Sequence, residues 1–97
     1  MATVVCSGRA LRYIERALKQ LLKQSPAAAL DAAAAIESAV DHLASHPLVG
    51  RRVQGDVREL IISYGRTGYV ALYRFAVATD EVRILALEHQ RELLFVP

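Results

Sequence analysis

The sequence predicts an α+β domain of order β-α-α-β-β-β, in which a helical hairpin packs on one face of a small, mainly antiparallel sheet. The first half contains two helical patterns in direct succession, and the second half contains three β-rich runs joined by short turn-like segments. A length of 97 residues suffices for one compact domain. We therefore expect residues 1–97 to form a single domain without repeats or linkers.

The chain begins with a strand and an amphipathic helix. Residues 2–6 are a short β-branched run, typical of a strand. Ser7 is a good N-cap for a helix that continues to about Lys23. One side of this helix is apolar, with the three-and-four spacing of a buried face: Leu11, Ile14, Leu18, Leu21 and Leu22. Basic residues recur with similar spacing and form a separate stripe: Arg9, Arg12, Arg16, Lys19 and Lys23.

A second helix follows after a very short link. Ser25 is a suitable N-cap and Pro26 a suitable first helical residue, and the pattern continues to about Ser45, before His46-Pro47. Its predicted inner face consists of Ala29, Ala33, Ile36, Val40 and Leu43. Because the link is so short, the two helices should form an antiparallel hairpin.

The second half has a β pattern. Residues 49–56 are predicted to be a turn-rich connector, followed by strands at 57–63, 68–77 and 82–88. The separating segments, 64–67 and 78–81, are short enough to require antiparallel neighbours. Gly65 and Gly68 are placed where a hairpin turn needs positive φ. The apolar tail, residues 93–97, is expected either to extend the sheet or to pack on a partner.

Composition limits the possible functions. The net charge of +2 is too small to predict a nucleic-acid binder from bulk charge. A mean hydropathy of +0.24 predicts apolar surface that meets a partner, unless an alanine- and leucine-rich core accounts for it. The single cysteine, Cys6, excludes an internal disulfide and is interpreted as a small buried hydrophobe. Since no signal-peptide pattern or membrane-length apolar segment is present, we expect a cytoplasmic protein.

Four motifs carry a resemblance to a known family. They are HPLVGR at 46–51, VREL at 57–60, GYVALYR at 68–74 and VRILALEHQRE at 82–92. In this order and spacing they resemble the RelE/ParE toxins of bacterial type II toxin–antitoxin systems. The resemblance covers most of the chain, because the initial strand and helical hairpin also fit. It implies a toxin held inactive by a cognate antitoxin of the ParD or RelB kind.

The family implies two activities. RelE-like members cut mRNA in the ribosomal A site, whereas ParE-like members poison DNA gyrase. Cleavage without carboxylates needs several converging cations with a tyrosine or histidine. Positions where the nucleases carry such groups hold Leu60, Val70, Gln90 and Phe95 here. This departure favours gyrase inhibition. The alternatives are mRNA cleavage and an inactive family member that only binds its antitoxin.

The candidate site residues differ between these functions. A nuclease would use a group near the open ends of the strands at 68–77 and 82–88: Arg58, Arg66, His89 and Arg91. A purely structural alternative is a cross-strand charge network of Arg58, Glu59 and Arg74. A surface that binds the target or the antitoxin would use the basic stripe and the apolar tail: Arg9, Arg12, Arg16, Lys19, Lys23, Leu93, Leu94, Phe95 and Val96. The alternative for the stripe is a solvated helix face. No pattern indicates a metal or cofactor.

Overall fold

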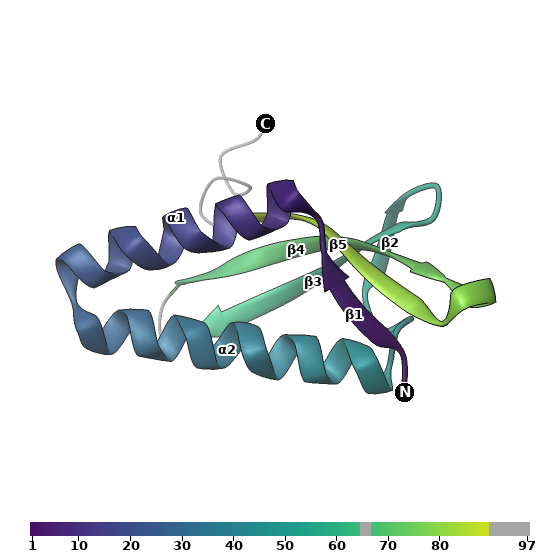
Figure 1. Cartoon of the computed structure of the whole chain (residues 1–97), viewed down its shortest axis with the longest axis horizontal. Coiled ribbons are helices and arrows are strands. Elements are labelled where there is room, and N and C mark those ends of the chain that lie inside the picture. The colour runs from purple at the N-terminus through teal and green to yellow at the C-terminus, as the bar shows by residue number, and fades with distance from the viewer. Residues whose placement is uncertain (65–66, 90–97) are drawn as a thin grey trace.

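A computed structural model of the chain describes residues 1–64 and 67–89, and within them two helices and five strands. In chain order the elements are β1 (Thr3–Cys6), α1 (Gly8–Gln24), α2 (Pro26–Ser45), β2 (Arg51–Gln54), β3 (Val57–Tyr64), β4 (Thr67–Ala76), the 3₁₀ turn η1 (Val77–Thr79) and β5 (Glu81–His89). The predicted α+β class is confirmed. Figure 1 shows the helical hairpin along the long axis of the molecule, with its turn at the end away from β1 and β2.

Both predicted helix starts are confirmed by their caps. The Ser7 hydroxyl accepts a hydrogen bond from the backbone N–H of Ala10 at 3.0 Å, and the Ser25 hydroxyl accepts one from that of Ala28 at 3.2 Å. Ser7 also ties α1 to the sheet, because its hydroxyl donates to the carbonyl of Leu85 at 3.2 Å. Pro26 occupies the start of α2, where its missing N–H costs nothing.

The sheet is mixed and has the strand order β1-β5-β4-β3-β2. β1 pairs parallel with β5, whereas the other neighbours are antiparallel. A parallel pair needs a long connection, and here both helices and the strands β2, β3 and β4 lie between β1 and β5 in the chain. β5 carries a bulge, since Ala86 and Ile84 face the consecutive residues Leu72 and Tyr73 of β4.

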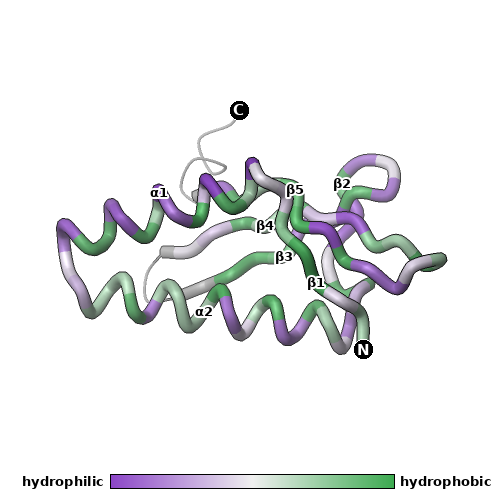
Figure 2. Tube along the Cα trace, viewed as in Figure 1, coloured by the Kyte–Doolittle hydropathy of each residue, from purple (hydrophilic) through white to green (hydrophobic). Residues whose placement is uncertain are grey.

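The helical hairpin packs on the sheet through two apolar clusters. One joins Leu43 of α2 to Tyr73, Val82 and Ile84 of the sheet. The other joins Ala32 and Ile36 of α2 to sheet residues and includes half-buried residues of α1, among them Ile14, Leu18 and Leu21. The alternation of hydrophilic and hydrophobic residues along α1 is visible in Figure 2. Neither helix in the described part of the chain is long and apolar enough to cross a membrane.

Two leucines of the predicted buried face of α1 are exposed instead. The exposed fractions are 48% for Leu11 and 55% for Leu22. The buried side of α1 is centred near Ile14 and Leu21, and a rotation of about 100° per residue places Leu11 and Leu22 at its margin. The spacing of apolar residues therefore predicted a wider buried face on α1 than the structure has.

The predicted connector contains a strand. β2 pairs antiparallel with β3, with an irregularity between Arg52 and Gln54, and all four of its residues are exposed. An edge strand without a buried face has no apolar alternation, so its sequence gave no β signal. The positive φ predicted at Gly68 is not found and that predicted at Gly65 is not tested, whereas Gly55 and Asp80 have positive φ. Gly68 is paired within β4, Gly65 lies outside the described residues, and Gly55 has φ +57 in the β2–β3 turn.

Candidate functional site

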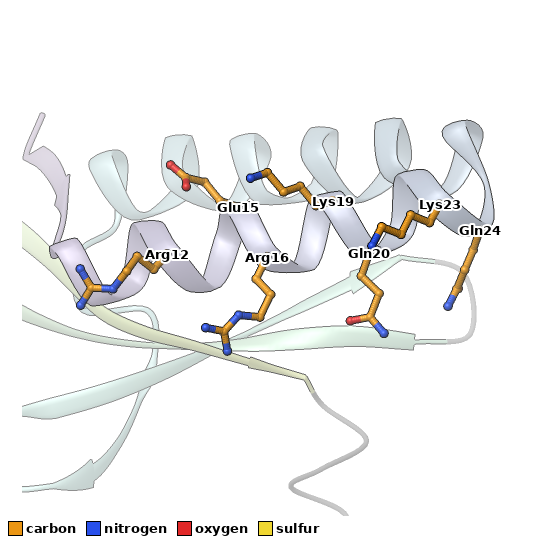
Figure 3. A pocket seen from close by; sticks show the side chains of 7 residues that line it. All are labelled: Arg12, Glu15, Arg16, Lys19, Gln20, Lys23 and Gln24. Carbon is orange, nitrogen blue, oxygen red and sulfur yellow. The ribbon is translucent and has the colours of Figure 1, made fainter.

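The outward side of α1 forms a basic surface. A shallow hollow there is lined by Arg12, Glu15, Arg16, Lys19, Gln20, Lys23 and Gln24. Figure 3 shows these side chains in two rows along the helix, one with Arg12 and Arg16 and the other with Lys19 and Lys23. We call Arg12, Arg16, Lys19 and Lys23 the α1 basic face.

The α1 basic face is exposed and unneutralised within the described residues. Its four cations lie within twelve consecutive residues, from Arg12 to Lys23, about 16 Å at the rise of an α-helix. The ion pairs within 1–64 and 67–89 join other residues, and Glu15 is the sole carboxylate lining the hollow. A surface of one charge sign attracts and orients an oppositely charged partner.

Arg9, although part of the predicted stripe, has a different environment. Its guanidinium donates a hydrogen bond to the Tyr13 hydroxyl at 3.4 Å and lies 5.7 Å from the centre of the Tyr13 ring. This hydrogen bond raises the pKa of Arg9. The guanidinium of Arg16 lies 6.0 Å from the same ring centre. Tyr13 therefore sits between two arginines, and cation–π attraction helps to orient both.

Arg58 is used to hold the connector. One guanidinium nitrogen donates to the carbonyl of Gly50 at 2.8 Å and to that of Leu48 at 3.2 Å. The Tyr73 hydroxyl, on a fully buried side chain, accepts from the backbone N–H of Gly50 at 2.8 Å. We call Gly50, Arg58 and Tyr73 the connector anchor. It unites residues from three of the sequence motifs and fixes the position where β2 begins.

Close packing explains the glycine of the connector anchor. A β-carbon at position 50 would lie 2.5 Å from the carbonyl oxygen of Glu59 and 2.6 Å from the Tyr73 hydroxyl oxygen. Neither neighbour is the free end of a flexible side chain. Burial raises the pKa of Tyr73, while the hydrogen bond from Gly50 and the charge of Arg58 oppose that shift. The phenol is therefore neutral at neutral pH.

The predicted charge network of Arg58, Glu59 and Arg74 is wrong. Glu59 binds Arg51 with an N–O distance of 2.6 Å. Arg74 instead binds Asp56, at 3.0 Å. The prediction failed because β2 was not expected, and β2 supplies the partner for Glu59. Exposed pairs of this kind contribute about 0–1 kcal/mol each.

Two members of the predicted nuclease group lie on described strands, Arg58 on β3 and His89 at the end of β5. Arg58 pairs with Tyr73 and His89 pairs with Tyr69, so the two positions are four residue steps apart along β4, about 13 Å of strand. Arg66 and Arg91 lie outside the described residues, as do Gln90 and Phe95. Of the other two positions compared with the nucleases, Leu60 packs against the core and Val70 is buried.

The remaining polar groups are dispersed. No group of three or more His, Cys, Asp or Glu side chains that could hold a metal occurs among residues 1–64 and 67–89. Cys6 is half-buried, and burial raises the pKa of its thiol, which disfavours the reactive thiolate. A second hollow, lined by His42, Ser45, His46, Pro47, Leu48, Val49 and Phe75, lies at the end of α2.

The known proteins that resemble this chain in sequence or in structure are toxins of toxin–antitoxin systems. Residues 4–94 match the family described as ParE toxin of type II toxin–antitoxin system, parDE. Toxin RelE3 of Caulobacter vibrioides is 38% identical over 92 residues, which cover 95% of this chain and 98% of that protein. The toxin–antitoxin complex RelBE2 from Mycobacterium tuberculosis contains a chain that is 27% identical, with a TM-score of 0.63, over 92% of this chain and 98% of that one.

The RelBE toxin–antitoxin complex of Escherichia coli extends the structural comparison. The TM-score is 0.62 over 91% of this chain and 95% of that chain, at 12% identity. At this identity the similarity concerns the fold alone. The two helices and the mixed sheet are therefore kept between chains with few residues in common.

Proposed function

Since the chain belongs to the RelE/ParE superfamily and is a toxin of the type II toxin–antitoxin class, we propose that it inhibits DNA gyrase in the manner of ParE toxins and is neutralised by a cognate antitoxin. Inhibition by binding needs a surface that recognises the target and no set of catalytic side chains. The α1 basic face is that surface in this proposal.

The single observation that carries the proposal is the contrast between α1 and the sheet. The cations of α1 have no ion-pair partner among the described residues. On the sheet, the guanidinium of Arg58 is bound to two backbone carbonyls. Stabilising a pentavalent phosphorus transition state needs cations preorganised around it. The side chains of Leu60 and Val70 are apolar and provide none.

The proposed antitoxin contact combines charge with apolar area. Leu11 and Leu22 are about half exposed on the same helix as the α1 basic face. An acidic and apolar segment that orders on binding would suit such a surface. The related RelBE2 chain was solved as a toxin–antitoxin complex. The apolar tail Leu93, Leu94, Phe95 and Val96 lies outside the described residues and stays a proposed antitoxin contact. Unchanged antitoxin affinity after deletion of residues 93–97 would remove it from the proposal.

A gyrase assay with matched variants tests the proposal. Purified protein is added to gyrase, plasmid DNA and ATP, and supercoiling and cleaved DNA are measured. Wild type should reduce supercoiling and trap cleaved DNA, and the antitoxin should suppress both effects. A variant with Arg12, Arg16, Lys19 and Lys23 all changed to alanine should lose at least tenfold in potency. The matched control, with alanine at Arg51, Arg52, Arg74 and Arg83, removes the same charge elsewhere and should retain potency.

The second candidate is ribosome-dependent cleavage of mRNA. It is favoured by the names of the relatives, since the 38% identical homologue is called Toxin RelE3 and the 27% identical chain is from a RelBE2 complex. Arg58, Arg66, His89 and Arg91 are the residues proposed for it. Gyrase that stays fully active in excess toxin, with ribosome-dependent breaks in translated mRNA, would overturn the gyrase proposal and support this one.

A third outcome corresponds to an inactive family member. Induced expression without antitoxin would then leave growth unchanged, although the protein would still bind its antitoxin. Growth arrest in the same experiment excludes this possibility and leaves the two toxin activities to be separated by the gyrase and mRNA assays.

A further inference from the structure

The end of α2 carries two histidines one turn apart. His42 lies in the last turn and His46 is the C-cap, and both residues are exposed. The backbone N–H of His46 donates to the carbonyl of His42 at 2.8 Å, so the helical turn between them is closed. Side chains four residues apart on a helix are neighbours. The centres of the two imidazole rings are 5.1 Å apart, and the ring planes are tilted by 51°.

This separation fits two imidazoles that share one cation. A ring nitrogen lies roughly 1.1 Å from its ring centre and binds Zn²⁺ at about 2.0–2.1 Å, which places the metal about 3.2 Å from each centre. Two such rings would have centres about 4.5 Å apart at a right-angled metal and about 5.2 Å apart at a tetrahedral one. The observed 5.1 Å lies within this interval.

The surroundings leave both rings available. The two imidazole rings contact each other. Within residues 1–64 and 67–89, neither ring forms a side-chain hydrogen bond or an ion pair. The last carbonyls of a helix also carry partial negative charge, which favours a cation at that end. Exposed imidazoles can turn about their side-chain bonds, so a nitrogen of each can face a common point without a change of backbone.

We propose that His42 and His46 form a two-nitrogen chelate for a late first-row divalent cation. Imidazole suits Cu²⁺, Ni²⁺ and Zn²⁺, and affinity for such ligands is highest for Cu²⁺. Water completes the coordination, because the described residues provide no third His, Cys, Asp or Glu beside the pair. The site is at the opposite end of the hairpin from its turn and does not depend on the proposed toxin activity (Figure 1).

Metal titration of the untagged full chain tests this site. CuCl₂, NiCl₂ and ZnCl₂ are each titrated alone into the protein by calorimetry, and the nitrogen ligands of bound Cu²⁺ are counted by electron paramagnetic resonance. Wild type should bind about one equivalent, with two nitrogens, and its thermal midpoint should rise with metal concentration. His42→Ala and His46→Ala should each weaken binding at least tenfold. The double variant should bind little more weakly than either, because each single change already destroys the chelate.

His89→Ala is the control, since His89 is the third histidine of the chain and should not affect binding. Both histidines of the pair are exposed, so circular dichroism should show all variants folded. His42→Gln and His46→Gln provide a second pair of variants that keep polar side chains. Absence of binding by wild type, retention of wild-type affinity by the double variant, or loss of affinity in His89→Ala would overturn the proposal.

Discussion

Arg58 and Arg16 are both arginines on regular elements, yet their guanidinium groups have different surroundings. Arg58 donates to the carbonyls of Leu48 and Gly50 and helps to fix the connector. Arg16 lies on an exposed helix face beside Lys19, with no described ion pair. The connector anchor therefore stabilises the fold, and the α1 basic face remains available for a partner. Residue type alone did not distinguish these roles, because the distinction depends on which backbone groups lie within reach.

Changing Gly50 should have the largest effect on the connector anchor. In Gly50→Ala, the added β-carbon would meet the Glu59 carbonyl oxygen at 2.5 Å and the buried Tyr73 hydroxyl oxygen at 2.6 Å. Backbone and ring must shift, and we expect a loss of about 3 kcal/mol in the free energy of unfolding, the upper range for an overpacked site. Urea denaturation measures it.

Gly55→Ala is the matched control for Gly50→Ala. A β-carbon at position 55 would meet no other atom, but the backbone there has a φ of +57. The substitution therefore strains the backbone conformation without causing a steric clash. A cost of about 1 kcal/mol is expected. If the two variants lose equal stability, close approach at Gly50 is not what makes glycine necessary there.

Removing Arg58 should have the next largest effect. Arg58→Ala leaves two backbone carbonyls without their charged donor, one of them partly buried, and should cost about 2 kcal/mol. Arg52→Ala removes an exposed arginine with one hydrogen bond, to the carbonyl of Gly55, and should cost less than about 0.5 kcal/mol. If Arg58→Ala is as stable as Arg52→Ala, the hydrogen bonds of Arg58 do not stabilise the fold more than those of an exposed arginine.

The helices and strands that bury one face were predicted from the sequence, whereas the exposed strand β2 was not. Both helices, their serine caps and four of the five strands lie close to the predicted positions, because periodicity and capping are local signals. β2 is exposed throughout and has no such signal. The connector anchor was also missed, since it depends on a register that places Tyr73 opposite Arg58. The His42–His46 pair had a usable signal in its four-residue spacing, but it was not interpreted as metal-binding.

Tyr73→Phe should have a smaller effect that depends on pH. It removes the acceptor of the Gly50 N–H and should cost about 1 kcal/mol at neutral pH. Burial raises the pKa of Tyr73 above its ordinary value of 10.0, so the folded state favours the neutral phenol. This contribution to stability is complete below pH 10 and is lost as pH rises through the folded-state pKa.

Denaturation at a series of alkaline pH values measures this contribution. Above pH 10 the stability of wild type should fall more steeply than that of Tyr73→Phe. Tyr13→Phe is the control, because its hydroxyl is bonded to exposed Arg9. Parallel curves for wild type and Tyr73→Phe would show that the buried phenol does not cause the alkaline loss.

The α1 basic face should contribute least to stability. Alanine at Arg12, Arg16, Lys19 and Lys23 removes exposed side chains that form no described ion pair, and alanine has the highest helix propensity. Each change should alter the free energy of unfolding by less than about 0.5 kcal/mol. Lower toxicity at unchanged stability would assign these cations to a partner, whereas toxicity that declines in proportion to stability would make the face structural. Arg58→Ala provides the opposite case, since any loss of toxicity there should follow its loss of stability. Measured together, the two variants distinguish an arginine that binds a partner from one that holds the fold.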